Sequence, residues 1–265
     1  MSSIVRPTSA QMTRRLIVLA TAVFAVAVGW SQQLLGWGQS PADFSADSDE
    51  TLRVAGYAFS IWGLIYLGIL AYAVRQAMPQ TGESLLINRL GWPSVAAFLG
   101  IGWWVVAAGF DWETATVVLI FASLAVLLLP LLHNADAIRA LGRTERDRWL
   151  VVWPLALLAG WLTVASPVNL LTVATGNDAL PEALSPTAWA VVAVAVVVLL
   201  ALFVTWRLRM LGYALPISWG LLGVFAAEME RNPPLAYVAL AAAVAVLIAA
   251  VILTFRLRPG VERAR

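Results

Sequence analysis

The sequence predicts an all-α integral membrane protein, an eight-transmembrane-helix bundle with both termini in the cytoplasm. Hydrophobic residues make up 61% of the 265 residues and charged residues only 12%, against about 25% charged residues in an ordinary soluble domain. Several apolar stretches also reach the roughly 20 residues that a helix needs to cross about 30 Å of hydrocarbon. A chain that crosses the bilayer many times accounts for both observations.

Eight spans are predicted, at about residues 15–36, 54–77, 91–109, 114–133, 149–171, 186–206, 212–228 and 235–256. The first follows Arg14 and Arg15, and no small-residue cleavage site precedes the acidic loop after it, so we interpret it as a retained helix and not as a signal peptide. The seventh is short and contains Pro216 and three glycines, a pattern that also fits a kinked or re-entrant segment.

The arginines favour eight spans and give the orientation. All 17 basic residues are Arg, and with the N-terminus inside only Arg53 and Arg231 fall in outer segments, as expected if Arg near span ends is retained on the cytoplasmic side. Without the seventh span, the Arg-rich tail would lie outside. The arginines lie beside the spans and form no single patch, so we expect a lipid bilayer and no nucleic acid as partner. The expected location is the inner (plasma) membrane of a bacterium, with multiple passes.

The polar residues predict neither catalysis nor a metal site. The chain has no Cys, and no acidic, basic or His side chain lies in the middle of a predicted span, where such residues usually mark ion pathways. The only histidine, His133, ends the fourth span, and we interpret it as an interfacial residue and not as a haem ligand. The loops, including 37–53 and 172–185, are interpreted as polar turns too short for a separate domain. Function must therefore lie in the bundle or at its rims.

Aromatic and small polar residues inside the spans are the candidate functional residues. Trp62 lies about eight residues into the second span, with Phe59 and Tyr66 near it on the same helical face. Trp161 lies deeper in the fifth span and is followed by Asn169. Ordinary helix packing could explain each polar residue singly. Together these residues also fit an aromatic-lined pocket for a flat apolar ligand.

The same residues carry a resemblance to a known family. The segment GYAFSIWGLIYLGILAY at 56–72 and the segment WPLALLAGWLTVASPVN at 153–169 resemble the second and fifth helices of the TspO/MBR family, the tryptophan-rich sensory or translocator proteins. Trp62 and Tyr66 keep the spacing of the second helix, and Trp161 and Asn169 that of the fifth. Trp103 and Trp104 stand at the place of the third-helix Trp, although the family's Asn three residues earlier is absent.

The resemblance implies a five-helix membrane fold that binds porphyrins, other tetrapyrroles or sterol-like molecules. It covers about residues 15–171, and longer eight-span bacterial relatives look closer to the chain than the five-helix members do. We therefore expect a TspO/MBR-like five-helix bundle over residues 1–171 and three additional helices with an Arg-rich tail over 172–265. The resemblance implies a ligand site lined by Phe59, Trp62, Tyr66, Trp103, Trp104, Trp161 and Asn169.

The preferred hypothesis is a non-catalytic sensory or binding protein without a resident cofactor, with a tetrapyrrole as a candidate ligand. The alternatives are a transporter or permease for a neutral lipophilic solute, an enzyme that degrades porphyrin, and a purely structural membrane component with a filled interior. No internal repeat supports the transporter. Small residues in the eighth span, Ala239, Ala242, Ala243, Ala245 and Ala249, fit either internal packing or a homodimer seam.

Overall fold

The structure, a computed structural model, describes residues 6–46, 51–78 and 84–255, and these residues form helices and connecting turns without any strand. Eight helices are long and apolar enough to cross a membrane. They are α1 (Ser9–Leu35), α3 (Ile61–Ala77, preceded by the 3-10 turn η1, Gly56–Ser60), α4 (Leu85–Gly109), α5 (Glu113–His133), α7 (Trp153–Gly176, preceded by the π-helical turn η2, Arg148–Val152), α8 (Pro186–Leu208), α9 (Leu211–Glu228) and α10 (Pro233–Phe255). This confirms the predicted all-α membrane fold.

Two short helices lie in the connections. Helix α2 (Pro41–Ala46) follows α1, and α6 (Ala135–Ala140) follows α5. The sequence was interpreted as a polar turn at 37–53, but α2 buries Phe44 and Ser45. The Arg-rich tail after residue 255 and the acidic residues at 47–50 lie outside the described residues.

Local sequence signals set where several helices begin. The Thr8 side chain accepts from the Gln11 backbone N–H while the Gln11 side chain accepts from the Thr8 N–H, a capping box that starts α1. The hydroxyl of Ser185 caps α8 at the Ala188 N–H, and Pro186 occupies the first turn, where no N–H partner is needed. With the turns η1 and η2 counted as parts of their spans, the helices begin within about two residues of the predicted starts, except that α1 and α4 begin six residues earlier.

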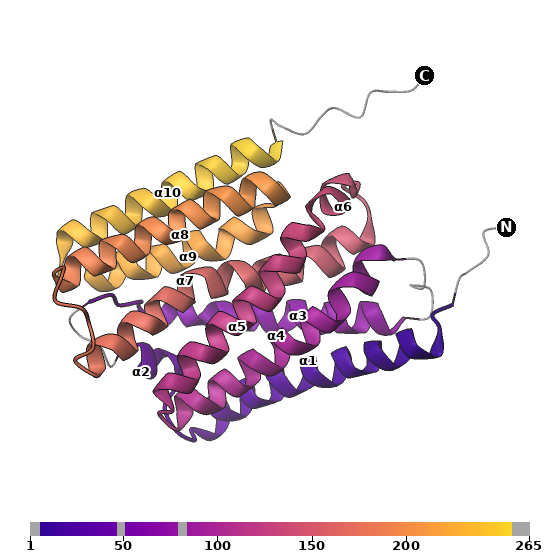
Figure 1. The fold of residues 1–265 in the computed structure, drawn as a ribbon, viewed down its shortest axis with the longest axis horizontal. Coiled ribbons are helices and arrows are strands. Elements are labelled where there is room, and N and C mark those ends of the chain that lie inside the picture. The colour runs from indigo at the N-terminus through magenta and orange to yellow at the C-terminus, as the bar shows by residue number, and fades with distance from the viewer. Residues whose placement is uncertain (1–5, 47–50, 79–83, 256–265) are drawn as a thin grey trace.

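Helix α7 runs through the centre of the bundle (Figure 1). It packs against α3, α5, α8 and α9, while α1 and α4 lie on one side of it and α10 on the other. The start of α1 and the end of α10 lie at the same end of the bundle (Figure 1), as an even number of spans requires. We call the opposite end, which holds α2, the α2 end.

The seventh span is a continuous helix and is neither re-entrant nor interrupted. Helix α9 runs from Leu211 to Glu228 with Pro216 inside it. Its glycines allow close packing: a Cβ at Gly160 of α7 would lie 2.1 Å from the carbonyl oxygen of Tyr213 in α9. The backbones of α7 and α9 therefore touch, as is common where small residues meet in membrane bundles.

Some of the small residues of α10 pack against other helices of the same chain. Ala239, Ala242 and Ala243 are buried within the chain, and the Ser218 hydroxyl of α9 donates to the Ala243 carbonyl at 3.1 Å. Helices α8, α9 and α10 thus form one packed group beside α7 (Figure 1).

Candidate functional site

A cavity lies inside the bundle toward the α2 end, enclosed by residues of α2, η1, α3, α4, α5, α7 and α9. We call it the aromatic cavity, because five of its lining residues carry aromatic rings: Phe44, Phe59, Trp62, Trp104 and Trp161. Apolar side chains and Gly220 make up most of the remaining wall, and the polar lining residues are Ser45, Asn169 and Thr172. The arrangement suits an apolar guest with few polar anchors.

Trp161 is the central ring of the wall and is only 3% exposed. The ring of Phe59 meets it edge-to-face with centroids 5.8 Å apart, and the ring of Trp62 does so at 6.3 Å. Phe44 of α2 meets Trp104 of α4 in the same way at 6.1 Å. Edge-to-face pairs are a favoured aromatic geometry, so the rings fix one another's orientation around the cavity.

The Asn169 amide joins three helices. Its Oδ1 accepts a hydrogen bond of 2.7 Å from Trp104 Nε1 of α4, and its Nδ2 donates to Thr116 Oγ1 of α5 at 2.9 Å. An amide has one further donor and one further acceptor position. In this structure the amide therefore holds α4, α5 and α7 together at the cavity wall, and a hydrogen bond from Asn169 to a ligand would use its remaining capacity.

The structure brings five of the seven predicted site residues to the aromatic cavity. Phe59, Trp62, Trp104, Trp161 and Asn169 all line it. Tyr66 instead lines a neighbouring groove beside α1, with its ring 5.3 Å from that of Trp62.

Trp103 lies away from the cavity. Its side chain is 50% exposed on the outside of α4 and lies 5.9 Å, centroid to centroid, from Phe24 of α1. Adjacent helical residues differ by about 100° around the axis, so only one of two neighbouring tryptophans can face inward.

Sequence reasoning missed the residues that α2 and α9 contribute. Phe44 and Ser45 come from the connection that was interpreted as a polar turn, and Gly220 comes from the seventh span. Two sequence signals mark α2: the apolar Phe44 within a polar stretch, and the pair Ser40 and Asp43 around Pro41, which cap the start of the helix reciprocally. Gly220 carries no signal of its own, because its place at the cavity depends on how α9 packs.

Hydrogen bonds attach the segment before α3 to α9, and α9 thereby becomes part of the cavity wall. Three hydrogen bonds join them: Ala55 N–H to the Gly223 carbonyl at 3.0 Å, Trp219 Nε1 to the Ala58 carbonyl at 2.9 Å, and the Tyr57 hydroxyl to the Leu222 carbonyl at 3.1 Å. These bonds hold η1 and its Phe59 ring against the cavity.

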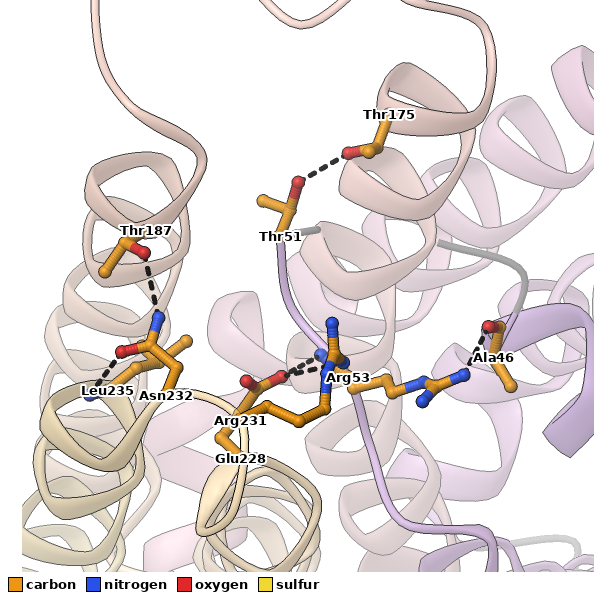
Figure 2. A network of polar contacts seen from close by, with 9 residues as sticks. All are labelled: Ala46, Thr51, Arg53, Thr175, Thr187, Glu228, Arg231, Asn232 and Leu235. Atoms are coloured by element: carbon orange, nitrogen blue, oxygen red, sulfur yellow. Dashed lines mark hydrogen bonds and ion pairs between the residues drawn. The ribbon is translucent and has the colours of Figure 1, made fainter. Parts of the chain in front are cut away.

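Polar contacts close the α2 end (Figure 2). The Arg53 backbone N–H donates to Glu228 at the end of α9, and the Arg53 guanidinium donates to the Ala46 carbonyl at the end of α2. Thr51 and Thr175 share a hydrogen bond of 2.6 Å between their hydroxyls. The segment that enters η1 is therefore attached to α2, α7 and α9 at once.

The aromatic cavity is small, with a volume of about 30 Å³. That is room for about two water molecules, whereas pockets for drug-sized ligands measure about 300–1,000 Å³. A groove of about 310 Å³ lies on the other side of Phe59 and Trp62, beside α1, α2 and α3. Pro41, Phe59 and Trp62 line both spaces, so these side chains form the partition between them.

Three buried polar atoms in the cavity wall have no hydrogen-bond partner among the described residues: Ser45 Oγ, Trp62 Nε1 and Thr172 Oγ1. Buried polar groups in native proteins are usually paired, with protein or with water. A guest or water in the cavity could supply the missing partners.

No group of three or more His, Asp or Glu side chains that could hold a metal ion occurs in the part of the chain that the structure describes. His133 lies at the far end of α5 in an open groove with Arg89 and Asn134, away from the aromatic rings.

The fold and the site define a multi-pass α-helical membrane protein with an internal aromatic cavity. Comparison with known proteins gives the family: the sequence matches TSPO-like protein over residues 14–252, so the chain belongs to the TSPO-like family. The match includes α8, α9 and most of α10, beyond the 15–171 over which the resemblance was noticed. No curated protein and no solved structure gives a significant match to this chain.

Proposed function

We propose that the protein is a non-catalytic binding or sensory protein that receives a flat, mainly apolar ligand, such as a tetrapyrrole, in the aromatic cavity. The observation that supports this most directly is the convergence of Trp62, Trp104 and Trp161 from three different helices on one internal space. A purely structural component would fill that space with side chains. We also propose that the protein lies in the inner membrane.

The volume of the cavity requires that ligand entry moves side chains. Rotation of Phe59 and Trp62 would remove the partition and join the cavity of about 30 Å³ to the groove of about 310 Å³. The combined space reaches the range of small-molecule sites. The Trp62 indole has no hydrogen-bond partner that would resist such a rotation.

Aromatic walls recognise a flat ligand by dispersion and by edge or face contacts. Trp161 is only 3% exposed and belongs to the central helix α7, so it offers a preorganised surface, whereas Trp62 lies at the partition and would adapt to the guest. We assign Trp161 to the fixed wall of the site and Trp62 to its movable wall.

Tryptophan emission during titration with protoporphyrin tests the proposal. The full chain in lipid nanodiscs should show saturable quenching, and replacing both Trp62 and Trp161 by Phe should weaken binding by about tenfold, because two ring contacts of about 0.5–1.5 kcal/mol each are altered. Trp103→Phe is the matched control, since Trp103 is exposed on the outer face of α4, and it should bind as the wild type does.

Unchanged emission, or quenching that survives the double replacement, would overturn the proposal. Proteoliposomes separate binding from transport: a binding protein gives saturable association only, while accumulation of the solute inside the vesicles would assign the transporter alternative. Loss of porphyrin absorbance in light would assign an enzymatic activity instead.

A further inference from the structure

We propose that the part of the ligand that enters the aromatic cavity is uncharged and carries a hydroxyl or carbonyl group, and that Ser45 and Thr172 bind this group toward the α2 end. The inference rests on the proposed function and specifies the chemistry of the guest. It is carried by two residues from separate elements that line the same cavity and whose buried hydroxyls have no hydrogen-bond partner among the described residues.

Both side chains are thoroughly buried. Ser45, on α2, is 6% exposed, and Thr172, near the end of α7, is 4% exposed. Neither hydroxyl oxygen has a hydrogen-bond partner among the described residues, and both residues line the aromatic cavity. A buried hydroxyl that gives up its bonds to water without replacing them destabilises the protein.

Other hydroxyls of α7 find a partner within the helix. Thr163 donates to the Ala159 carbonyl at 2.8 Å and Ser166 to the Leu162 carbonyl at 2.7 Å, each four residues earlier. Such back-bonding is the usual solution for Ser and Thr inside helices. Thr172 lies on the same helix and does not make this bond, so its hydroxyl remains available to the cavity.

The lining of the cavity also restricts the charge of the guest. Among the described residues, this lining contains no Arg, Lys, His, Asp or Glu. An ionised group inside would lack both water and a counter-charge, which is strongly unfavourable in an apolar interior. A carboxylate on a bound molecule would therefore stay outside the cavity, while a neutral hydroxyl or carbonyl can exchange hydrogen bonds with two hydroxyls, each of which both donates and accepts.

The position of the pair gives the orientation of the guest. Thr172 follows Trp161 by 11 residues along α7, a distance of about 16 Å at 1.5 Å per residue. The polar group would lie toward α2 and the ring system toward Trp161. The cavity volume of about 30 Å³ would accommodate about two waters, which could satisfy the hydroxyls until a ligand displaces them.

Three matched probes test the inference: pyrene, 1-hydroxypyrene and 1-pyrenecarboxylate. Energy transfer from tryptophan to each probe is measured with the full chain in nanodiscs. We expect 1-hydroxypyrene to bind more tightly than pyrene, and 1-pyrenecarboxylate to bind most weakly. Thr172→Val and Ser45→Ala should each weaken binding of 1-hydroxypyrene by up to about tenfold, the equivalent of one buried hydrogen bond, and change binding of pyrene by less than about twofold.

Thr205→Val is the matched control. The Thr205 hydroxyl, on α8, is also buried without a partner, but it does not line the aromatic cavity. This variant removes the same chemical group and should leave the affinities for all three probes unchanged.

The outcomes separate the two proposals. If no probe binds the wild-type chain and protoporphyrin does not quench it, the proposed function fails. The inference fails if pyrene and 1-hydroxypyrene bind equally well, or if Thr172→Val and Ser45→Ala weaken the binding of these two probes equally. In that case the cavity binds ligands, but the two hydroxyls do not select among them and bind only water. Tightest binding of the carboxylate would also overturn the inference.

Discussion

At the scale of single residues, the site depends on which side chains are already engaged and which are free to meet a guest. Asn169, which belongs to the ligand site that the resemblance implies, bonds to Trp104 and Thr116 and so joins three helices. At the cavity, the side chains without a hydrogen-bond partner among the described residues are instead Ser45, Trp62 and Thr172. Some polar residues of the interior therefore hold helices together, and others line the cavity.

Replacing Asn169 by Leu should therefore destabilise the bundle. The change leaves the buried Trp104 N–H without its acceptor, and we expect the free energy of unfolding to fall by about 1–3 kcal/mol. Thermal unfolding of the purified protein in detergent, followed by far-UV circular dichroism, measures the change. In a Trp104→Phe background the same substitution should cost less, because the donor is already gone. An equal cost in both backgrounds would show that the hydrogen bond between these two residues contributes little.

Helix packing decides the shape of the cavity at the scale of elements. Helix α9 touches α7 at Gly160 and is bonded to the segment before α3. Its Gly220 forms part of the cavity wall, and a Cβ there would lie 2.7 Å from Val164 Cγ1, so the position has no room for a larger side chain. The seventh span, the weakest by sequence, is thus one of the elements that enclose the site.

Gly160→Ala should separate α7 from α9. The added Cβ would lie 2.1 Å from the Tyr213 carbonyl oxygen, and overpacking of this kind typically costs about 1–3 kcal/mol. Gly63→Ala in α3 is the matched control, since nothing lies within 4 Å of its Cβ position, and it should be neutral or stabilise by up to about 1 kcal/mol through helix propensity. Thermal unfolding compares the two. Equal melting temperatures would contradict the close contact of α7 with α9.

At the scale of the whole molecule, the long helices pack as one bundle with α7 at its centre (Figure 1). The family match also continues through α8 and α9 into α10. Because α9 supplies part of the cavity wall, the helices after residue 171 contribute to the site. The division into a five-helix bundle and three added helices stays a prediction about how the chain is organised.

The predicted orientation can be tested by labelling, because the chain contains no Cys. Ala140 lies at the end of α6 and Ala183 in the connection before α8, and both are exposed. With the termini in the cytoplasm, a membrane-impermeant maleimide should label Ala183→Cys in intact spheroplasts and Ala140→Cys only after permeabilisation. The reverse pattern would place the termini outside, and labelling of both sites in intact cells would contradict the number of spans.

The sequence predicted the spans well because length and hydropathy are local properties. All eight appear as helices, and both the Trp62–Tyr66 pair and the Trp161–Asn169 pair lie at or beside the cavity. It could not choose between Trp103 and Trp104, since two adjacent residues in an apolar helix differ only in the face they occupy. It also missed α2, whose six residues have no helical period long enough to recognise.

The sequence by itself determined that this chain has eight membrane-spanning helices and that its tryptophan pattern resembles that of a known family. Both can be determined in this way because the length of an apolar stretch and the spacing of a motif depend only on the order of residues along the chain. Tertiary structure alone decided which rings face inward, that α2 and α9 enclose the cavity, and that Ser45 and Thr172 meet it without partners. Those properties arise where helices distant in sequence pack together, and the neighbours of a side chain there are set by the fold.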